Sequence, residues 1–448
     1  MSSLVVVGTV LQTPTPRTLA VSSDVAVVVG DDGVIEAVHP AASMEAKDAW
    51  AAAPRVQRLN AHERLLPGLI DLHVHAPQWP QLGTGLDLGL EKWLFDYTFP
   101  LEVRYADAGF ALEVWDRLVP TLLRHGTTTA VYFSSIHEEA TRLLAATCVR
   151  HGQRAFVGRV AMDHPEGTPR WYRDVDAKAG VAASAASIET IAGLPGARGL
   201  VAPIITPRFI PTCTDELLSG LGELAASTGA LVQTHCSESD WEHGHVLERF
   251  GRRDAWMLQQ FGLMRRGTVL AHGNLLDDGD FGVIRSAAAG VAHCPLSNSY
   301  FSNAVFPLRR ALQQGVAVGL GSDVAGGAHP GLLPQCGHAV TVSRMLEDGV
   351  DGSRGAAERG VPGSRVDVVT AFHAATVGGA SVLGIPAGLL APGKLFDAFV
   401  VRTNDRESGL HVYEGLDDEA RIFEKIVRLA APSDIPAVWV GGRRVVTR

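Results

Sequence analysis

The chain has 448 residues and a formal net charge of −9 at pH 7, from 39 Lys and Arg against 48 Asp and Glu. Apolar residues make up 46% and charged residues 19%, as in ordinary globular proteins and unlike disordered ones. The acidic balance argues against a nucleic-acid partner, because phosphate backbones are bound by clustered Lys and Arg. The length fits one large domain with a smaller one attached.

The cysteines and the start of the chain bear on the cellular compartment. The five cysteines are scattered and include no Cys-x-x-Cys pair, so we expect neither a disulfide framework nor a structural zinc finger. Residues 1–11 lack the basic start and the long apolar core of a secretory signal, and no stretch reaches the length of a membrane span. We therefore expect a cytoplasmic protein that does not associate with membranes.

Short runs of β-branched residues mark both ends of the chain. They cover residues 4–11, 26–30, 34–38, 398–402 and 437–446. The Gly and Pro residues around them predict tight turns, and the Gly-Gly pair in the last run predicts a hairpin. We expect one small β-sandwich domain, built jointly from residues 1–66 and 395–448.

Between these ends, apolar strands alternate with helical stretches, a pattern typical of βα repeats in the α/β class. The predicted strands are 66–75, 127–133, 155–160, 200–205, 230–235, 268–272, 290–293 and 316–323. Eight such units over about 250 residues are what a (β/α)8 TIM-type barrel requires. We expect residues 67–394 to form this barrel, with its chemistry at the C-terminal ends of the strands.

His73 and His75 end the first predicted barrel strand. Alternate residues of a strand project to the same face, so both imidazoles point toward one place. Further candidate ligands stand at the ends of the fifth to eighth strands, namely His235, His272, His293 and Asp323. Because a barrel brings its strand ends together at one mouth, this arrangement predicts a metal site.

The donor types and one missing residue type bear on the identity and number of the metal ions. Three imidazoles with one carboxylate suit zinc, and they also suit iron. A two-metal site would need a further bridging anion, such as a carboxylated lysine, whose place would be the fourth strand. Residues 199–211 in that region contain no Lys. We therefore expect a single ion.

Glu238 and Asp323 are the candidate proton carriers. Glu238 follows His235 by three positions, past the strand end, where its carboxyl group can reach over the metal without binding it. The alternative role for Glu238 is that of an inactive carboxylate at a helix N-terminus. Asp323 can combine weak metal binding with accepting the proton of an attacking water.

Several segments carry a resemblance to a known family. They are Pro67–Gln78, Gly83–Leu88, Tyr97–Pro100, Thr206–Phe209, Thr234–Glu238, His293–Asn298 and Gly321–Gly327. With them the chain resembles the amidohydrolase superfamily and, more narrowly, its guanine deaminases, over nearly its whole length. The His-x-His pair and the final Asp are shared across the superfamily, whereas Gly-Thr-Gly-Leu-Asp-Leu and Thr-Pro-Arg-Phe are more particular.

The resemblance implies roles for individual residues of this chain. One zinc ion per subunit would be held by His73, His75, His235 and Asp323. Glu238 and Asp323 would move protons, and His272 would lie beside the metal and its water as a further catalytic residue.

The resemblance also implies a reaction and a substrate site. The reaction is hydrolytic deamination of guanine to xanthine and ammonia in purine catabolism, carried out by a homodimer. Gln78 and Arg208 would hydrogen-bond to the polar edge of the purine, and Phe209 would pack on its ring. Related rings, such as 8-oxoguanine, isoxanthopterin and other pterins, stay open as substrates. Two alternatives remain, namely hydrolysis of an amide or imidazolone ring with the same metal centre, which Gln78, Arg208 and Phe209 disfavour, and a barrel protein that acts as a scaffold without catalysis.

Other conspicuous side chains are expected to have structural roles. Cys236 and Cys294 directly follow strand-end histidines, so the pleat turns them to the opposite face and into the core. His243 and His245 stand two apart in a predicted helix, where such side chains diverge, and we expect them on a solvated face. His293 is expected to face inward without binding the metal.

Overall fold

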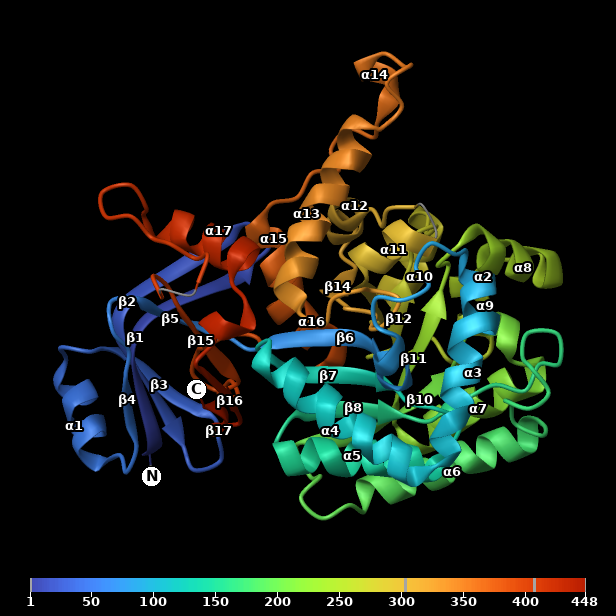
Figure 1. The fold of residues 1–448 in the computed structure, drawn as a ribbon, viewed down its shortest axis with the longest axis horizontal. Coiled ribbons are helices and arrows are strands. Elements are labelled where there is room, and N and C mark those ends of the chain that lie inside the picture. Colours follow the sequence, from blue (N-terminus) through green and yellow to red (C-terminus); the bar gives the residue numbers. More distant parts are fainter. Residues whose placement is uncertain (1, 302–303, 406–407, 448) are drawn as a thin grey trace.

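The structure is a computed structural model that describes residues 2–301, 304–405 and 408–447. Figure 1 shows two parts side by side, a barrel surrounded by helices and a smaller β unit made from the first and last segments of the chain, drawn in blue and red. Among the helices in the described parts of the chain, none has both the length and the apolar character needed to cross a membrane.

Eight parallel strands form the closed barrel. In their order around the wall they are β6 (Leu69–His75), β7 (Thr127–Phe133), β8 (Arg154–Gly158), β10 (Val201–Pro207), β11 (Leu231–Cys236), β12 (Val269–His272), β13 (Gly290–His293) and β14 (Ala317–Leu320). The wall closes because β14 pairs in parallel with β6, where Leu320 lies opposite Asp71. The two-residue strand β9 (Val160–Ala161) pairs with the end of β10. The predicted (β/α)8 barrel and its eight strands are confirmed.

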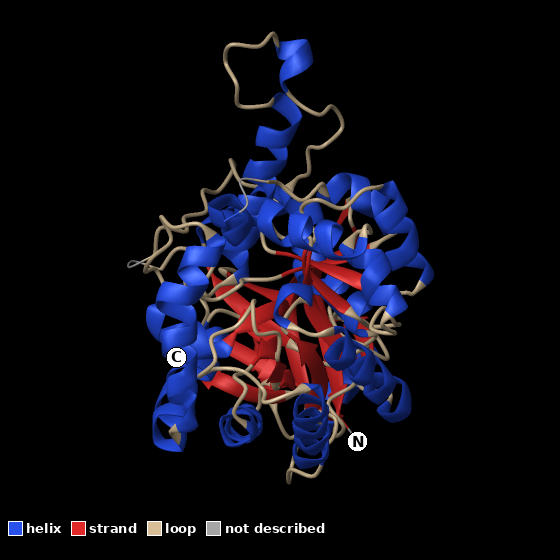
Figure 2. Cartoon of the chain, turned by 90° about the vertical axis from the view of Figure 1, so that its right-hand side faces the viewer, coloured by secondary structure: helices blue, strands red, loops and turns tan. Residues whose placement is uncertain are grey.

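Helices connect the strands and cover the outside of the barrel, as Figure 2 shows. They are α4 (Ala108–Arg124), α5 (Glu138–His151), α6 (Ala177–Ala192), α7 (Asp215–Thr228), α8 (Asp240–Phe250), α9 (Asp254–Gln260), α10 (Asp278–Ser286), α11 (Pro295–Phe301), α12 (Leu308–Gln313), α13 (Leu332–Asp348), α15 (Val368–His373) and α16 (Gly379–Leu383). Helix α4 shows the local reasons. Asp107 caps its first turn by accepting a hydrogen bond from the backbone N–H of Gly109, and Leu118 and Leu122 lie on its buried face.

Shorter helical segments lie between β6 and α4. They are η1 (Ala76–Gln81), α2 (Leu90–Trp93), η2 (Leu94–Thr98), α3 (Phe99–Glu102) and η3 (Val103–Ala106). Another short helix, α14 (Ala356–Arg359), follows α13, and α14 projects away from the barrel together with the far end of α13 in Figure 1. The segments η1, α2 and η2 contribute to the pocket described below.

The β unit is one continuous sheet of eight strands. They are β1 (Ser2–Thr15), β2 (Thr18–Gly30), β3 (Ile35–Pro40), β4 (Val56–Arg58), β5 (Glu63–Pro67), β15 (Ala398–Arg402), β16 (Ala437–Val440) and β17 (Arg443–Thr447). Strand β5 joins the two chain ends, because it pairs in parallel with β1 and antiparallel with β15. Helix α1 (Met44–Ala52) packs on one face of the sheet, and α17 (Glu419–Leu429) follows β15 in the chain. A small β unit built from both ends is therefore confirmed.

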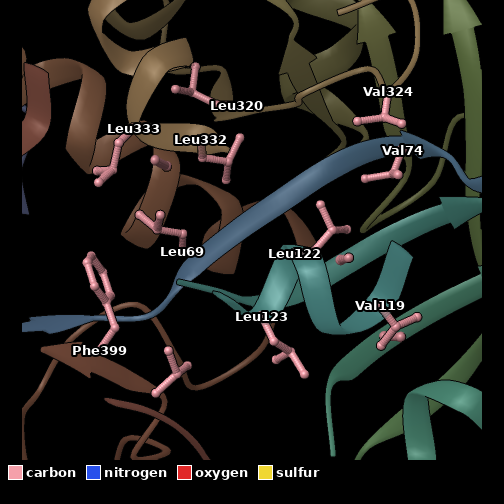
Figure 3. Close-up of a cluster of buried hydrophobic side chains, with 14 of the residues drawn as sticks. Leu69, Val74, Val119, Leu122, Leu123, Leu320, Val324, Leu332, Leu333 and Phe399 are labelled. Atoms are coloured by element: carbon pink, nitrogen blue, oxygen red, sulfur yellow. The ribbon is translucent and has the colours of Figure 1, made fainter. Parts of the chain in front are cut away.

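A buried cluster outside β6 orients the strand (Figure 3). Leu69 and Val74 of β6 belong to it, together with Leu122 of α4, and all three are fully buried. Burying a side chain of this size contributes about 1.5–3 kcal/mol. Because neighbouring residues of a strand face opposite ways, this outward packing of Val74 directs His73 and His75 away from the cluster.

Candidate active site

A pocket of about 370 Å³ opens at the C-terminal ends of the barrel strands. Its lining residues are His75, Gln78, Leu90, Trp93, Leu94, Arg208, Phe209, His235, Glu238, His272, Phe301, Asp323 and Gly326. The predicted metal-binding, proton-carrying and base-binding residues all line this pocket except His73, which is fully buried. His293, expected to face inward without binding the metal, is buried and is not among the lining residues. Trp93 and Leu94, from the segment after β6, close one side together with Phe301.

The four predicted metal ligands lie close together. Their contacts are His75 Nε2 to His235 Nε2 at 3.0 Å, His73 Nε2 to Asp323 Oδ1 at 3.3 Å, and His75 Nε2 to Asp323 Oδ1 at 3.7 Å. His272 and Glu238 belong to the same cluster, since their ligand atoms lie within 4.8 Å of others in it. Side chains separated by up to 250 positions in the sequence thus face one point.

The protonation of the imidazoles fits a bound cation. Burial holds the pKa of His73, His75 and His235 well below the usual value of a histidine, and neighbouring histidines lower it further. They are therefore neutral at pH 7, which is the form that binds metal. Among the described residues, neither ring nitrogen of His73 has a hydrogen-bond partner. The nitrogen lone pairs of neutral imidazoles repel one another where they converge, and a divalent cation removes that repulsion. The donor set therefore fits a metal.

Hydrogen bonds behind the histidines set which ring nitrogen faces the cluster. His235 donates from Nδ1 to the backbone oxygen of Arg208 at 2.6 Å, which leaves the lone pair on Nε2. His272 donates from Nδ1 to Oδ1 of Asn298 at 2.9 Å, with the same effect. Burial also lowers the pKa of His272, so this ring is neutral as well.

Asp71 ties the first and last barrel strands together below the site. Its Oδ1 accepts hydrogen bonds from the backbone N–H of Ser322 at 2.9 Å and of His73 at 3.2 Å. Burial raises the pKa of Asp71 to about 7. The sequence-based prediction missed this residue, and a register shift between Asp71 and Val74 interrupts the alternation of β6, so its spacing from His73 could not have placed its side chain.

Three residues near the strand ends have a left-handed backbone. Ser237, His272 and Asp323 have φ values of 50°, 73° and 49°. This conformation costs about 1–2 kcal/mol for a residue with a β-carbon, so packing and hydrogen bonds must hold it. For Asp323 the backbone N–H donates to the oxygen of His73 at 2.9 Å. The consequence is that each strand turns sharply at its end, at the mouth of the barrel.

Glu238 is buried beside the metal-binding cluster. Burial raises the pKa of its carboxyl group well above the usual value, and the neighbouring Asp323 carboxylate raises it further. Its Oε1 lies 3.6 Å from Nε2 of His272. Burial likewise raises the pKa of Asp323. Both carboxyl groups therefore hold a proton more readily than exposed ones do, which suits them to proton transfer.

The backbone of Glu238 is held from below by residues that the sequence-based prediction missed. Its N–H donates to Oε2 of Glu242 at 2.7 Å, and its carbonyl oxygen accepts from Nδ2 of Asn274 at 2.8 Å. Burial, followed by the carboxylate of Asp254, raises the pKa of Glu242 well above its usual value. The spacing of four between Glu238 and Glu242 is the only local signal that could have suggested this contact.

The expectation for His243 is wrong, because this residue does not lie on a solvated face. Its Nδ1 lies 3.1 Å from Oδ2 of Asp254, at the start of α9, and 3.3 Å from the hydroxyl of Ser237. The packing of α9 against α8 buries this side of the helix. Cys236 and Cys294 are fully buried, as predicted.

Arg208 and Phe209 follow β10, and Gln78 lies in η1, where its Oε1 accepts a hydrogen bond from the backbone N–H of Ala325 at 3.3 Å. The guanidinium of Arg208 forms a buried ion pair with Glu102, with Nη1 2.6 Å from Oε2. The Phe209 ring centroid lies 5.7 Å from that of His235. An aromatic ring and a buried cation therefore stand next to the metal-binding cluster, which suits a flat polar heterocycle.

Comparison with known proteins assigns the family. The amidohydrolase family model matches residues 64–445. A probable guanine deaminase of Schizosaccharomyces pombe is 37% identical over 395 residues, which are 87% of this chain and 73% of that protein. The chain belongs to the guanine deaminase group of the amidohydrolase family.

Two further similarities agree with this assignment. Guanine deaminase of Mus musculus is 32% identical over 99% of this chain and 97% of its own length. The crystal structure of guanine deaminase from C. acetobutylicum with bound guanine superposes with a TM-score of 0.87 at 28% identity, covering 98% of this chain and 99% of that one. This amidohydrolase is a hydrolase of carbon–nitrogen bonds in cyclic amidines, and the family and the cluster support a metal cofactor.

Proposed function

We propose that this chain is a guanine deaminase that converts guanine and water to xanthine and ammonia with one zinc ion per subunit. The observation that carries the proposal is the convergence, in one pocket, of a neutral His and Asp cluster, a buried Glu238 of raised pKa and the buried cation of Arg208. The names of the similar proteins support the same reaction.

In this proposal the ion is held by His73, His75, His235 and Asp323, whose ligand atoms lie close together. We propose zinc in preference to iron, because imidazoles with one carboxylate are common ligands of catalytic zinc. When bound, a divalent cation supplies Lewis acidity that makes hydroxide available at neutral pH.

The protein residues then move the protons. Asp323 accepts the proton that the attacking water loses, and Glu238 donates its proton to the ring nitrogen next to the amino-bearing carbon as the new carbon–oxygen bond forms. A second proton, delivered to the amino group by the same carboxyl groups, lets the carbon–nitrogen bond break and ammonia leave. His272, neutral and with its Nε2 lone pair facing the cluster, accepts a hydrogen bond that holds the attacking oxygen in line.

Gln78, Arg208 and Phe209 bind the base. Phe209 supplies a flat apolar surface for the ring, and the polar groups of Gln78 and Arg208 pair with the edge that carries the oxo group. The names of the similar proteins favour guanine over 8-oxoguanine, isoxanthopterin or another pterin, and they favour an enzyme over a scaffold. The proposal includes a cytoplasmic homodimer in purine catabolism, with a β domain of residues 1–66 and 395–448 and a barrel domain of residues 67–394.

An ultraviolet assay with guanine, 8-oxoguanine and isoxanthopterin side by side tests the proposal. We expect ammonia release and conversion to xanthine with guanine, at a kcat/KM well above those of the other two rings. The metal content of the same purified protein should be close to one zinc per chain. Absence of turnover with guanine in zinc-loaded protein would overturn the proposed activity.

A further inference from the structure

Glu102 lies directly behind the wall of the pocket. It ends α3, is fully buried, and contacts two residues that line the pocket, Gln78 and Arg208. Four donors point at its carboxylate. Arg208 Nη1 at 2.6 Å and the Tyr172 hydroxyl at 2.9 Å donate to Oε2, and Arg208 Nη2 and Gln78 Nε2, both at 3.1 Å, donate to Oε1.

This set of contacts uses the full hydrogen-bonding capacity of Glu102. A carboxylate offers about four acceptor positions and no donor, so the four donors saturate it. All the partners are also buried, with Gln78 and Arg208 only 1% exposed and Tyr172 not at all. In such a water-poor environment each contact is costly to break, so the carboxylate holds its partners in one arrangement.

Glu102 decides which way round the amide of Gln78 lies. An amide has a donor end and an acceptor end, and only the donor end can face a carboxylate. The Gln78 oxygen then accepts a hydrogen bond from the backbone N–H of Ala325 at 3.3 Å. One N–H and one acceptor position of Gln78 remain for a ligand.

Glu102 has a similar effect on Arg208. A guanidinium has five N–H groups, of which Glu102 takes two, so three remain. Burial alone would lower the pKa of Arg208, but the adjacent Glu102 carboxylate raises it, and the guanidinium stays charged. Gln78 and Arg208, which both line the pocket, together keep up to four donors and one acceptor that Glu102 and Ala325 do not use.

We propose that Glu102 is a positioning residue that sets the selectivity of the pocket for purines with an oxo group on the bound edge. The inference rests on the base-binding roles proposed above for Gln78 and Arg208. An oxo oxygen and ring nitrogens accept hydrogen bonds from this donor-rich wall. An exocyclic amino group in the same place sets donor against donor and leaves buried N–H groups unpaired.

Binding of two purines to the zinc-loaded wild-type protein gives the first test. Hypoxanthine carries an oxo group and adenine an amino group at the same ring carbon, and neither has the 2-amino group that the proposed reaction removes. Isothermal titration should show that hypoxanthine binds about tenfold to a hundredfold more tightly than adenine. Equal affinities would overturn the inference before any variant is made.

Two variants then test Glu102 itself. In Glu102→Gln the new amide can donate as well as accept, so position 102 no longer fixes the orientation of the Gln78 amide, and only the long contact with the Ala325 N–H, at 3.3 Å, still favours it. The ratio of the hypoxanthine affinity to the adenine affinity should therefore fall toward one. The matched control is Tyr172→Phe, which removes one donor to the same carboxylate without changing a group that lines the pocket. It should keep the wild-type ratio of the hypoxanthine affinity to the adenine affinity. A folded Glu102→Gln protein that keeps the wild-type ratio refutes the role of Glu102.

Folding and activity are measured separately in this design. Should Glu102→Gln fail to fold, Glu102→Asp keeps the charge but withdraws the carboxylate by one methylene, and it should lose part of the ratio. An unchanged ratio in folded Glu102→Asp also counts against the inference. Guanine turnover by the wild-type protein tests the proposed function by itself. Normal turnover with no effect of Glu102→Gln on the ratio would refute only the role of Glu102.

Discussion

Replacing Glu238 by Gln removes one proton carrier and changes little else. The amide has nearly the same volume, and the backbone contacts of this residue to Glu242 and Asn274 do not involve the altered group. Because Glu238 is not among the proposed ligands, the protein should keep its zinc. Glu238 is only 4% exposed, so bulk water cannot easily replace it as an acid.

The expected loss follows from this burial. General acid catalysis contributes about 10²- to 10⁴-fold, and a buried site without access for a substitute acid belongs near the upper end. We therefore expect kcat for guanine to fall by about 10³- to 10⁴-fold, or roughly 4–5 kcal/mol in the activation barrier. The fall should appear in kcat more than in KM, because the base-binding residues are unchanged.

The assay combines steady-state kinetics with zinc analysis of the same preparation. Glu248→Gln is the matched control, because it makes the same chemical change at an exposed position of α8. This variant should leave kcat unaltered. A near-normal kcat for Glu238→Gln would remove this residue from the mechanism. Loss of zinc from the variant would instead show that Glu238 is a ligand.

Three further outcomes are expected. Glu242→Leu leaves the buried N–H of Glu238 without an acceptor, so it should lower the unfolding free energy by about 1–3 kcal/mol and reduce kcat. Glu242→Gln keeps an acceptor, so its loss of unfolding free energy should be smaller. Equal losses in urea titrations of the two variants would contradict this reasoning. Dialysis against a chelator should abolish turnover and lower Tm, and adding zinc should restore both, because an ion at saturating zinc stabilises the fold by about 3–4 kcal/mol. An unchanged Tm would argue against a bound ion. Leu122→Ala should cost about 2–5 kcal/mol in urea unfolding, because the fully buried side chain belongs to the cluster that includes Leu69 and Val74 of β6. A loss below about 1 kcal/mol would refute that packing role.

Much of the fold was predictable because its signals are local. Strands of the barrel are short apolar runs bounded by turn residues, and all eight were recognised from this pattern. The metal-binding cluster was predictable for a related reason. Once eight parallel strands close into a barrel, the residues at their C-terminal ends must meet, so His73 and His235 could be brought together from their positions alone.

The sequence alone therefore determined the barrel, the β unit shared by both chain ends, and the residue types at the strand ends, since each depends on patterns a few residues long. Only the tertiary structure decided which side chains hold those residues in place. Glu102 and Arg208 are 106 positions apart, and His243 meets Asp254 across two helices. No periodicity marks such pairs, because they form only when separate elements pack and leave buried polar groups that must find one another.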